Sequence, residues 1–156
     1  MPHTVEIESL LDEADQQCKK RGARLTTKRK QVLAGLLHSD IALSAYDLVD
    51  YCREEHGQAI PAMSVYRMLD FLQSQYLVHK LSLANKYVAC AHIKCDHDHE
   101  VPQFLICGRC QRVEEINVPK AMIKALKRGV EEVGFELVSP QLEINCLCND
   151  CLSKPA

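Results

Sequence analysis

Two pairs of cysteines carry the clearest chemical signal in this 156-residue sequence. Cys107 and Cys110 form one Cys-x-x-Cys unit, and Cys148 and Cys151 form a second unit near the end of the chain. Zinc in structural sites takes four ligands in a tetrahedron and binds thiolates well. The two units therefore predict a four-cysteine zinc site that ties the last strand back to an earlier turn. Cys146 is a competing ligand, and redox-active dithiols or plain reduced cysteines are the alternatives.

A second set of metal-binding side chains is spread through the middle of the chain. His79 and Cys90 lie on two strand-like segments that we expect to form a hairpin, so their side chains can face each other. His97 and His99 follow in a histidine-rich loop, and Glu115 lies on a later strand. A mixed nitrogen, oxygen and thiolate site selects zinc over harder ions. Such a site would couple metal occupancy to the orientation of two units, as a sensor requires. The alternative is a solvated polar linker.

Positive charge is concentrated in one segment, although the formal net charge is only −2. No acidic residue occurs between Asp15 and Asp40. The basic residues of this segment are Lys19, Lys20, Arg21, Arg24, Lys28, Arg29 and Lys30. A basic patch in a near-neutral protein indicates local nucleic-acid binding, and a solvated helix end is the alternative. Arg24 and Lys28 are our candidate DNA contacts from this segment.

The first half of the chain contains the elements that must position these side chains. Apolar spacings of three and four predict four helices, at residues 5–21, 27–39, 45–56 and 64–75. Thr26 or Thr27 can cap the second helix, and Ser44 can cap the third. Two strand-like runs follow, at residues 76–83 and 86–91. This order is typical of a winged helix-turn-helix, in which Cys18 and Cys52 are expected to be small core residues.

The fourth predicted helix takes the place of the recognition helix in such a motif. Its apolar stripe packs inward, which leaves Ser64, Tyr66 and Arg67 facing outward near the N-terminus. That end of the helix reaches base edges in winged and other helix-turn-helix proteins. Four helices and a hairpin also occur in proteins that never contact DNA.

The second half of the chain has a different texture. We expect a hinge and metal loop over residues 92–102, a hairpin over 104–118, a helix over 119–133 and a strand over 135–144 bent at Pro140. The fold class is therefore α+β, with a winged helix-turn-helix at residues 1–91 and an α/β dimerisation domain at 103–156.

Several classes of function are disfavoured by the sequence. It has no apolar run long enough to cross a membrane and no secretory signal, so we expect a cytoplasmic protein. It also lacks a phosphate-binding glycine loop or a nucleophile motif, so we do not expect an enzyme. A zinc-dependent hydrolase with an open coordination position remains the alternative of another class, and a metal-stabilised protein-interaction module is a third.

Nearly the whole chain, from about residue 8 to 152, resembles the ferric uptake regulator superfamily, and most closely its zinc-responsive branch. The matching motifs are RLTTKRKQVL (24–33), SAYDLVDYCRE (44–54), SVYRMLDFLQ (64–73), LVHKL (77–81), KYVAC (86–90), FLICGRCQRVEE (104–115) and CLCNDC (146–151). The resemblance implies a zinc-loaded homodimer that binds a palindromic DNA operator and represses zinc-uptake genes. A regulator that responds to iron or peroxide is the alternative within the superfamily.

The resemblance also assigns roles to individual residues. It implies DNA contacts from Tyr46, Tyr66 and Arg67, with Arg67 as the main base reader. It implies a structural zinc bound by Cys107, Cys110, Cys148 and Cys151. The sensing zinc would be bound by His79, Cys90, Glu115 and one loop histidine, His99 in preference to His97. Two zinc ions per subunit follow, and the Asp-His-Asp-His run allows a third.

The sequence departs from the family pattern at three places. Thr26-Thr27 stands where Thr-Pro is usual, and Ser64-Val65 stands where Thr-Val is common, which affects only helix starts. The loop between Cys90 and Cys107 is longer than in close relatives, so the choice of loop histidine stays open. We also expect Asp50 and Arg53 to pair between neighbouring dimers on DNA.

Overall fold

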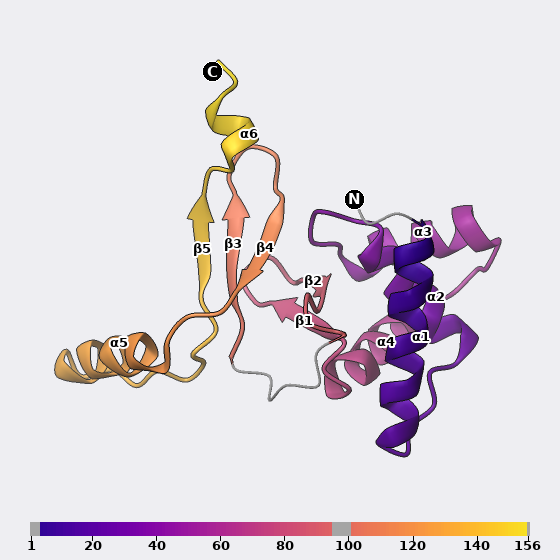
Figure 1. Cartoon of the computed structure of the whole chain (residues 1–156), viewed down its shortest axis with the longest axis horizontal. Coiled ribbons are helices and arrows are strands. Elements are labelled where there is room, and N and C mark those ends of the chain that lie inside the picture. Colours follow the sequence, from indigo (N-terminus) through magenta and orange to yellow (C-terminus); the bar gives the residue numbers. More distant parts are fainter. Residues whose placement is uncertain (1–3, 95–100, 156) are drawn as a thin grey trace. The chain divides into compact units, whose positions relative to one another are not determined.

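The computed structural model describes residues 4–94 and 101–155. The chain divides into two compact units, Met1–His97 and Asp98–Ala156 (Figure 1). Within the described residues, no helix is long and apolar enough to cross a membrane.

The first unit contains four helices and a two-stranded hairpin. The helices are α1 (Thr4–Lys20), α2 (Thr27–Leu37), α3 (Ala45–His56) and α4 (Ala62–Ser74), and the strands are β1 (Val78–Leu81) and β2 (Lys86–Ala89). Helices α2, α3 and α4 contact one another, and α1 packs against α2. Leu33, Leu48 and Leu69 are fully buried between them, as are Cys18 and Cys52. The predicted core role of these two cysteines is confirmed.

Local sequence explains where the first three helices begin and end. Thr26 caps α2 by accepting a hydrogen bond from the Arg29 backbone N–H. Ser44 and Asp47 form a capping box at the start of α3, with each side chain bonded to the backbone of the other. Gly57 ends α3 in the left-handed conformation, at φ +61°. Val5, in the first turn of α1, is exposed.

The fourth helix begins earlier than the sequence predicts. Its first residue is Ala62 and its cap is Pro61, where the predicted start was Ser64. The fixed φ of proline favours a position at the beginning of a helix, so the helix extends back to the proline. The helix therefore has two additional residues at its N-terminal end, Ala62 and Met63.

The hairpin that follows α4 is the wing of a winged helix. Strands β1 and β2 are antiparallel, with His79 opposite Val88, and Leu43 forms an additional bridge to Tyr87. Both strands are shorter than predicted. Tyr76 takes a left-handed φ of 58° just before β1, and Asn85 takes a φ of 48° in the turn, so neither belongs to an extended strand.

The second unit is built on a three-stranded sheet. Its elements are β3 (Gln103–Cys107), β4 (Val113–Ile116), α5 (Lys120–Glu132), β5 (Glu143–Cys146) and the short α6 (Asn149–Leu152). The strand order is β4-β3-β5, with β3 antiparallel to β4 and parallel to β5 (Figure 1). The α+β fold class predicted from the sequence is confirmed by this arrangement.

The strand predicted at 135–144 is wrong for residues 135–142. The side chain of Gln103, which is fully buried, donates to the Pro140 carbonyl at 2.8 Å and accepts from the Leu142 N–H at 2.6 Å. These bonds satisfy two backbone groups at the end of the segment, and the Leu142 carbonyl accepts from the Phe104 N–H at 2.9 Å. Strand pairing therefore starts only at Glu143 and extends to Cys146.

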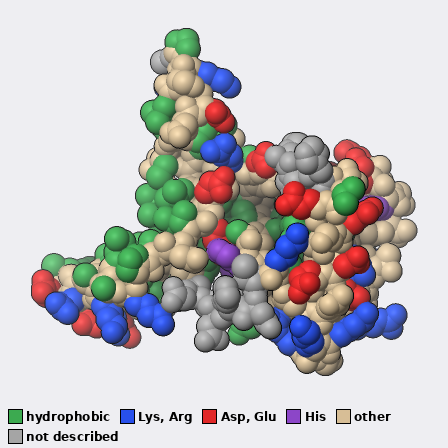
Figure 2. Space-filling model, in the orientation of Figure 1, with side chains coloured by type: hydrophobic (Ala, Val, Ile, Leu, Met, Phe, Trp, Pro, Cys, Tyr) green, Lys and Arg blue, Asp and Glu red, His purple; other side chains and the backbone are tan. Residues whose placement is uncertain are grey.

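Helix α5 is strongly amphipathic, yet none of its residues is buried. Ile123, Leu126, Val130 and Val133 follow one another at spacings of three and four residues, and none of these apolar side chains is buried. Figure 2 shows hydrophobic side chains along one side of this helix and charged side chains along the other. The second unit therefore presents an open apolar face.

Candidate metal centres and nucleic-acid interface

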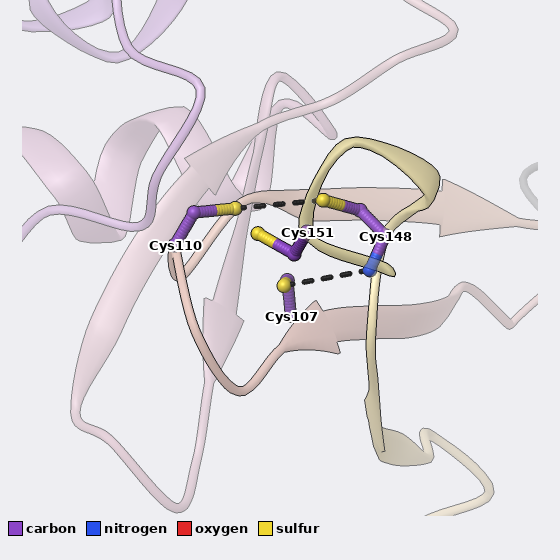
Figure 3. Close-up of side chains that lie close together, drawn as sticks. All are labelled: Cys107, Cys110, Cys148 and Cys151. Atoms are coloured by element: carbon purple, nitrogen blue, oxygen red, sulfur yellow. Dashed lines mark hydrogen bonds between the residues drawn. The ribbon is translucent and has the colours of Figure 1, made fainter. Parts of the chain in front are cut away.

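Four cysteines of the second unit converge at one end of its sheet. The sulfur atoms of Cys107, Cys110, Cys148 and Cys151 all lie within 4.8 Å of one another (Figure 3). The Cys110 and Cys148 sulfurs are 3.7 Å apart. A tetrahedral zinc with bonds of about 2.3 Å needs sulfur atoms separated by about 3.8 Å. The donor set and its spacing therefore fit a structural zinc ion.

The sheet register brings the two Cys-x-x-Cys turns together. Cys107 is the last residue of β3, and its strand partner on β5 is Cys146. Cys148 caps α6 and Cys151 lies inside that helix, so both sulfurs turn back toward β3 (Figure 3). Cys146, the strand partner of Cys107, is not in this group of four sulfur atoms, although the sequence allowed it as a ligand.

Hydrogen bonds shift the pKa values of the Cys107 and Cys151 thiols in opposite directions. The backbone N–H groups of Cys110, Cys148 and Arg109 point at the Cys107 sulfur and lower the pKa of its thiol to about 5. Cys151 donates its thiol proton to the sulfur of Cys148, and this bond together with burial raises the Cys151 pKa to about 12. One thiolate is thus prepared before any metal binds, as zinc ligation requires.

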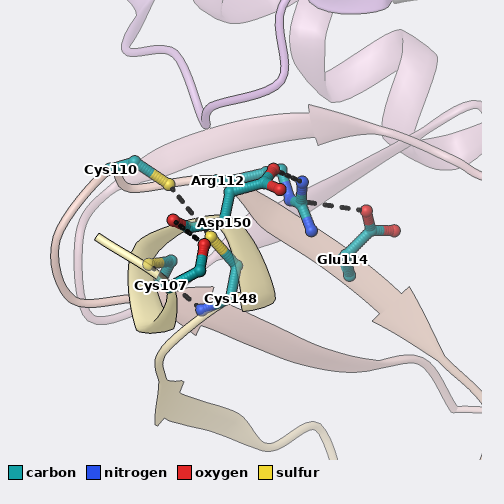
Figure 4. A network of polar contacts seen from close by, with 7 residues as sticks. Cys107, Cys110, Arg112, Glu114, Cys148 and Asp150 are labelled. Atoms are coloured by element: carbon teal, nitrogen blue, oxygen red, sulfur yellow. Dashed lines mark hydrogen bonds and ion pairs between the residues drawn. The ribbon is translucent and has the colours of Figure 1, made fainter.

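Two arginines surround this cluster, and the sequence alone did not indicate them. Arg112 lies 3.3 Å from Asp150 and 3.8 Å from Glu114 (Figure 4), and negative charge, first that of Cys148, raises its pKa. Arg109 donates to the Cys151 carbonyl at 2.6 Å and fastens α6 to the first turn. Four thiolates on one zinc ion leave a net negative charge, which nearby basic residues can balance. The basic residues inside and just after the first Cys-x-x-Cys unit were therefore the signal for these two arginines.

The wing of the first unit carries a second pair of metal-binding side chains. An imidazole nitrogen of His79 and the Cys90 sulfur lie within 4.8 Å of each other. Cys90 follows Val88, the strand partner of His79, by two residues, so the two side chains share one face. Cys90 is buried, and its sulfur accepts the His92 backbone N–H at 3.4 Å. A nitrogen and a thiolate at this spacing suit zinc.

The other predicted ligands of this site belong to different segments of the chain. Glu115 lies on β4 of the second unit, where it is half-buried. His97 and His99 lie outside the described residues.

The predicted DNA contacts differ in how far they face solvent. Arg67 is exposed, and Tyr46 is 65% exposed at the start of α3. Ser64 and Tyr66 are half-buried, and Tyr66 packs against the core of the first unit. Met63 is 66% exposed one turn before Arg67 and was missed because the helix was predicted to begin at Ser64.

Much of the basic segment is committed to contacts within the first unit. Lys19 pairs with Asp15 at 2.8 Å, and Arg29 lies 3.6 Å from the Phe71 ring while donating to the Arg24 carbonyl. Arg24 and Lys28 are exposed. These two side chains are the better candidates for phosphate contacts.

Asp50 and Arg53 form an ion pair within α3. Their side chains are 2.7 Å apart and largely exposed. The pair is therefore accessible on the surface of the first unit.

Comparison with known proteins places the chain in a family. The sequence profile of the ferric uptake regulator family matches residues 20–145. The zinc uptake regulation protein of Escherichia coli is 38% identical over 149 residues, which cover 96% of this chain and 85% of that protein. The ferric uptake regulation protein of Helicobacter pylori is 25% identical, over 93% of each chain.

A solved structure agrees with the sequence matches. A zinc uptake regulator complexed with zinc and DNA superposes with a TM-score of 0.78 at 34% identity, covering 94% of this chain and 95% of that one. The profile spans most of the residues described above, including the wing, the sheet and the first Cys-x-x-Cys turn. The chain therefore belongs to the ferric uptake regulator family.

Proposed function

We propose that this protein is a zinc-responsive transcriptional repressor that binds a palindromic operator as a zinc-loaded homodimer. The observation that carries the proposal is the pairing of His79 with Cys90 on the wing. This pair offers a metal a second place to bind, inside the winged-helix unit and separate from the four cysteines of the other unit. A metal bound there acts on the part of the chain that contacts DNA.

The four-cysteine cluster is the structural zinc site. Its ligands hold the end of the chain to β3, so its zinc stabilises the second unit at all times. The wing site is the sensing site. We assign it His79, Cys90, Glu115 and a loop histidine, His99 with His97 as the alternate. Each subunit then binds two zinc ions, and the Asp-His-Asp-His run allows a third.

Zinc at the sensing site restricts the geometry of the dimer. Residues 1–91 form the DNA-binding domain, 92–102 the hinge and metal loop, and 103–156 the dimerisation domain. Two half-sites of a palindrome are separated by about 34 Å, one turn of DNA. A metal-free protein whose DNA-binding domains sample many orientations binds more weakly, in proportion to the fraction of competent conformers.

Operator recognition is assigned to the N-terminal ends of α3 and α4. Arg67 reads a base edge, because arginine pairs bidentately with guanine. Tyr46, Ser64 and Tyr66 contact the backbone or neighbouring bases, and the exposed Arg24 and Lys28 contact phosphates.

Zinc is favoured over iron by two observations. Cys90 supplies a thiolate, whereas iron and manganese sensors favour oxygen and nitrogen ligands. The relative named for zinc uptake is 38% identical to this chain, and the relative named for ferric uptake is 25% identical. Competition between Zn(II) and Fe(II) for the Cys90 site distinguishes the two regulators, and preferential Fe(II) binding contradicts our assignment.

Neighbouring dimers on one operator are proposed to contact each other through Asp50 and Arg53. The support is that both side chains are charged, opposite in sign and exposed on α3. An exchange of partners between two dimers would keep both charges paired. Reversing both charges together should retain cooperative binding, and reversing either one alone should reduce it.

The function is tested by titrating a palindromic duplex with protein in the presence and absence of zinc. We expect Cys90→Ser to remove zinc-dependent binding while leaving a folded protein with one zinc per subunit. We expect Cys107→Ser to lose the structural zinc and to lower the free energy of unfolding of the second unit. Equal operator affinity with and without zinc would contradict the sensing role, and identical behaviour of the two variants would contradict the division into two sites.

A further inference from the structure

We propose that the C-terminal end of helix α1 positions the metal-binding wing, acting through Gln17 in the helix and Arg21 directly after it. These residues fasten the two ends of the segment that carries His79 and Cys90. The inference rests on the proposed function of the wing as a metal site. It assigns a role to a helix that supplies none of the proposed metal ligands or DNA contacts.

Arg21 holds the point where the chain enters the wing. Its guanidinium donates a hydrogen bond to the Gln75 carbonyl at 2.7 Å and lies 5.5 Å from the centre of the Tyr76 ring. Gln75 is the C-terminal cap of α4, and Tyr76 takes the left-handed φ of 58° that turns the chain toward β1. The joint that sets the direction of β1, and so the position of His79, is therefore bonded to the residue directly after α1.

Gln17 holds the point where the chain leaves the wing. Its side-chain amide donates to the backbone carbonyl of Ile93, and both residues are buried in the first unit. Between Cys90 and Ile93, the His92 backbone N–H donates to the Cys90 sulfur. The short turn after Cys90 is thus fixed at its sulfur by one bond and at its far end by α1.

The two anchors are joined at the C-terminal end of α1. Gln17 lies in α1, and Arg21 directly follows the last residue of the helix, with its backbone N–H donating to the Gln17 carbonyl at 3.3 Å. The buried Cys18 packs this end of α1 into the core. A side-chain amide buried in an apolar core is costly unless it is hydrogen-bonded, so Gln17 is not an interchangeable packing residue. The wing is held in its metal-binding form before metal arrives, and the ordering cost of binding falls accordingly.

The test compares each anchor with an exposed neighbour in α1. Gln17→Met keeps the length of the side chain and removes the donor, and Gln16→Met is its control. Arg21→Met removes the second anchor. Because Arg21 is exposed, this variant should still fold, and Lys20→Met is its control. Loss of groups that orient metal ligands costs about 10- to 100-fold in metal affinity. We expect about tenfold weaker metal binding in both anchor variants and unchanged binding in the controls.

The measurement uses Co(II) as the probe, with the four-cysteine site already filled with zinc. Binding is followed by the thiolate-to-cobalt charge-transfer absorption that Cys90 supplies. A second readout needs no metal at the wing: amide hydrogen exchange over residues 86–94 should be faster in both anchor variants. Equal cobalt affinity in Gln17→Met and Gln16→Met overturns the inference, even if Gln17→Met lowers the free energy of unfolding. If the cobalt absorption is still present in Cys90→Ser, the result overturns the proposed function instead.

Discussion

The residues that we propose to bind metal differ from those that we propose to contact DNA. Arg67 is the exposed charged residue of the predicted DNA-reading set on α4, whereas Ser64 and Tyr66 are half-buried. A guanidinium that pairs bidentately with guanine contributes specificity, and a lysine or arginine that contacts phosphate contributes affinity without specificity. Variants of Arg67 and variants of the residues proposed to contact phosphate should therefore affect DNA binding differently.

We predict that Arg67→Ala weakens binding to the cognate operator by about 1–3 kcal/mol and relaxes discrimination at one base pair of each half-site. Lys28→Ala, the control, should weaken binding evenly across operator variants and reduce the salt dependence by about one ion per site. Both are measured by binding isotherms on a set of operator variants at several salt concentrations. An unchanged preference at every base in Arg67→Ala contradicts the role of this residue as a base reader.

The acidity of Cys107 gives a prediction for the zinc-free protein. Backbone N–H groups hold the pKa of this thiol at about 5, below its usual 9.0, so it is a thiolate at neutral pH. A lowered folded-state pKa means that its stabilising contribution is lost as the pH falls through about 5. We expect the ultraviolet absorbance of thiolate to fall near pH 5 in the zinc-free protein, and this step to be missing in Cys107→Ser. A first step near pH 9 would contradict the assignment.

At the scale of elements, local signals in the sequence predicted most boundaries. Thr26, Ser44 and Gly57 act at helix ends as their types suggest, and the two Cys-x-x-Cys turns meet where the metal chemistry required. The failures have a different cause. The segment before β5 was predicted to be a strand, yet Gln103, far away in sequence, bonds to two of its backbone groups, at Pro140 and Leu142. Long-range hydrogen bonds of this kind leave no periodic trace.

The same limit applies to the candidate sites. The cysteine spacing predicted the four-thiol cluster, but Gln17 of α1 and Arg21 directly after it are linked to the wing by contacts to backbone carbonyls. A carbonyl acceptor is present at every residue, so neither partner could be identified from residue type. Tyr66 was expected to face outward, and it packs partly against the core because a tyrosine can bury its ring while its hydroxyl stays near water.

Two helical glycines give a prediction about packing between elements. A Cβ atom on Gly35 of α2 would lie 2.8 Å from Tyr51 and 2.9 Å from Leu48 on α3, whereas one on Gly129 of α5 would meet no atom within 4 Å. Alanine gains about 1 kcal/mol of helix propensity over glycine at either position. Overpacking costs about 1–3 kcal/mol, so Gly35→Ala should destabilise the first unit on balance.

Gly129→Ala is the matched control and should stabilise the second unit by about 0.5–1 kcal/mol. Urea unfolding of the zinc-loaded protein, followed separately for the two units, measures both changes. If Gly35→Ala is as stabilising as Gly129→Ala, the close approach of α2 to α3 at this glycine is not maintained in solution.

At the scale of the whole molecule, the second unit needs a partner to cover its apolar face. Among the exposed large apolar side chains of the second unit are Met122, Leu126, Val133, Phe135, Val138, Ile144 and Leu147. Contiguous apolar patches on this scale mark association sites, and a stable interface buries about 800 Å² on each partner. For the palindromic operator that we propose, a second copy of the chain is the partner that symmetry favours.

We therefore predict that replacing Phe135 and Val138 by glutamate converts the dimer to monomers without loss of the structural zinc. These side chains are 72% and 95% exposed within one chain, so glutamate at both positions should disturb folding little. Burying the two charged side chains in an interface would cost free energy because they would lose their hydration. Leu83→Glu is the control, because this wing residue is equally apolar, is 87% exposed and lies in the other unit. Sedimentation measures the mass, and zinc analysis verifies that the four-cysteine site is intact. A variant that remains dimeric would place the interface elsewhere, and a monomer that still binds the full palindrome with parental affinity would separate dimerisation from operator recognition.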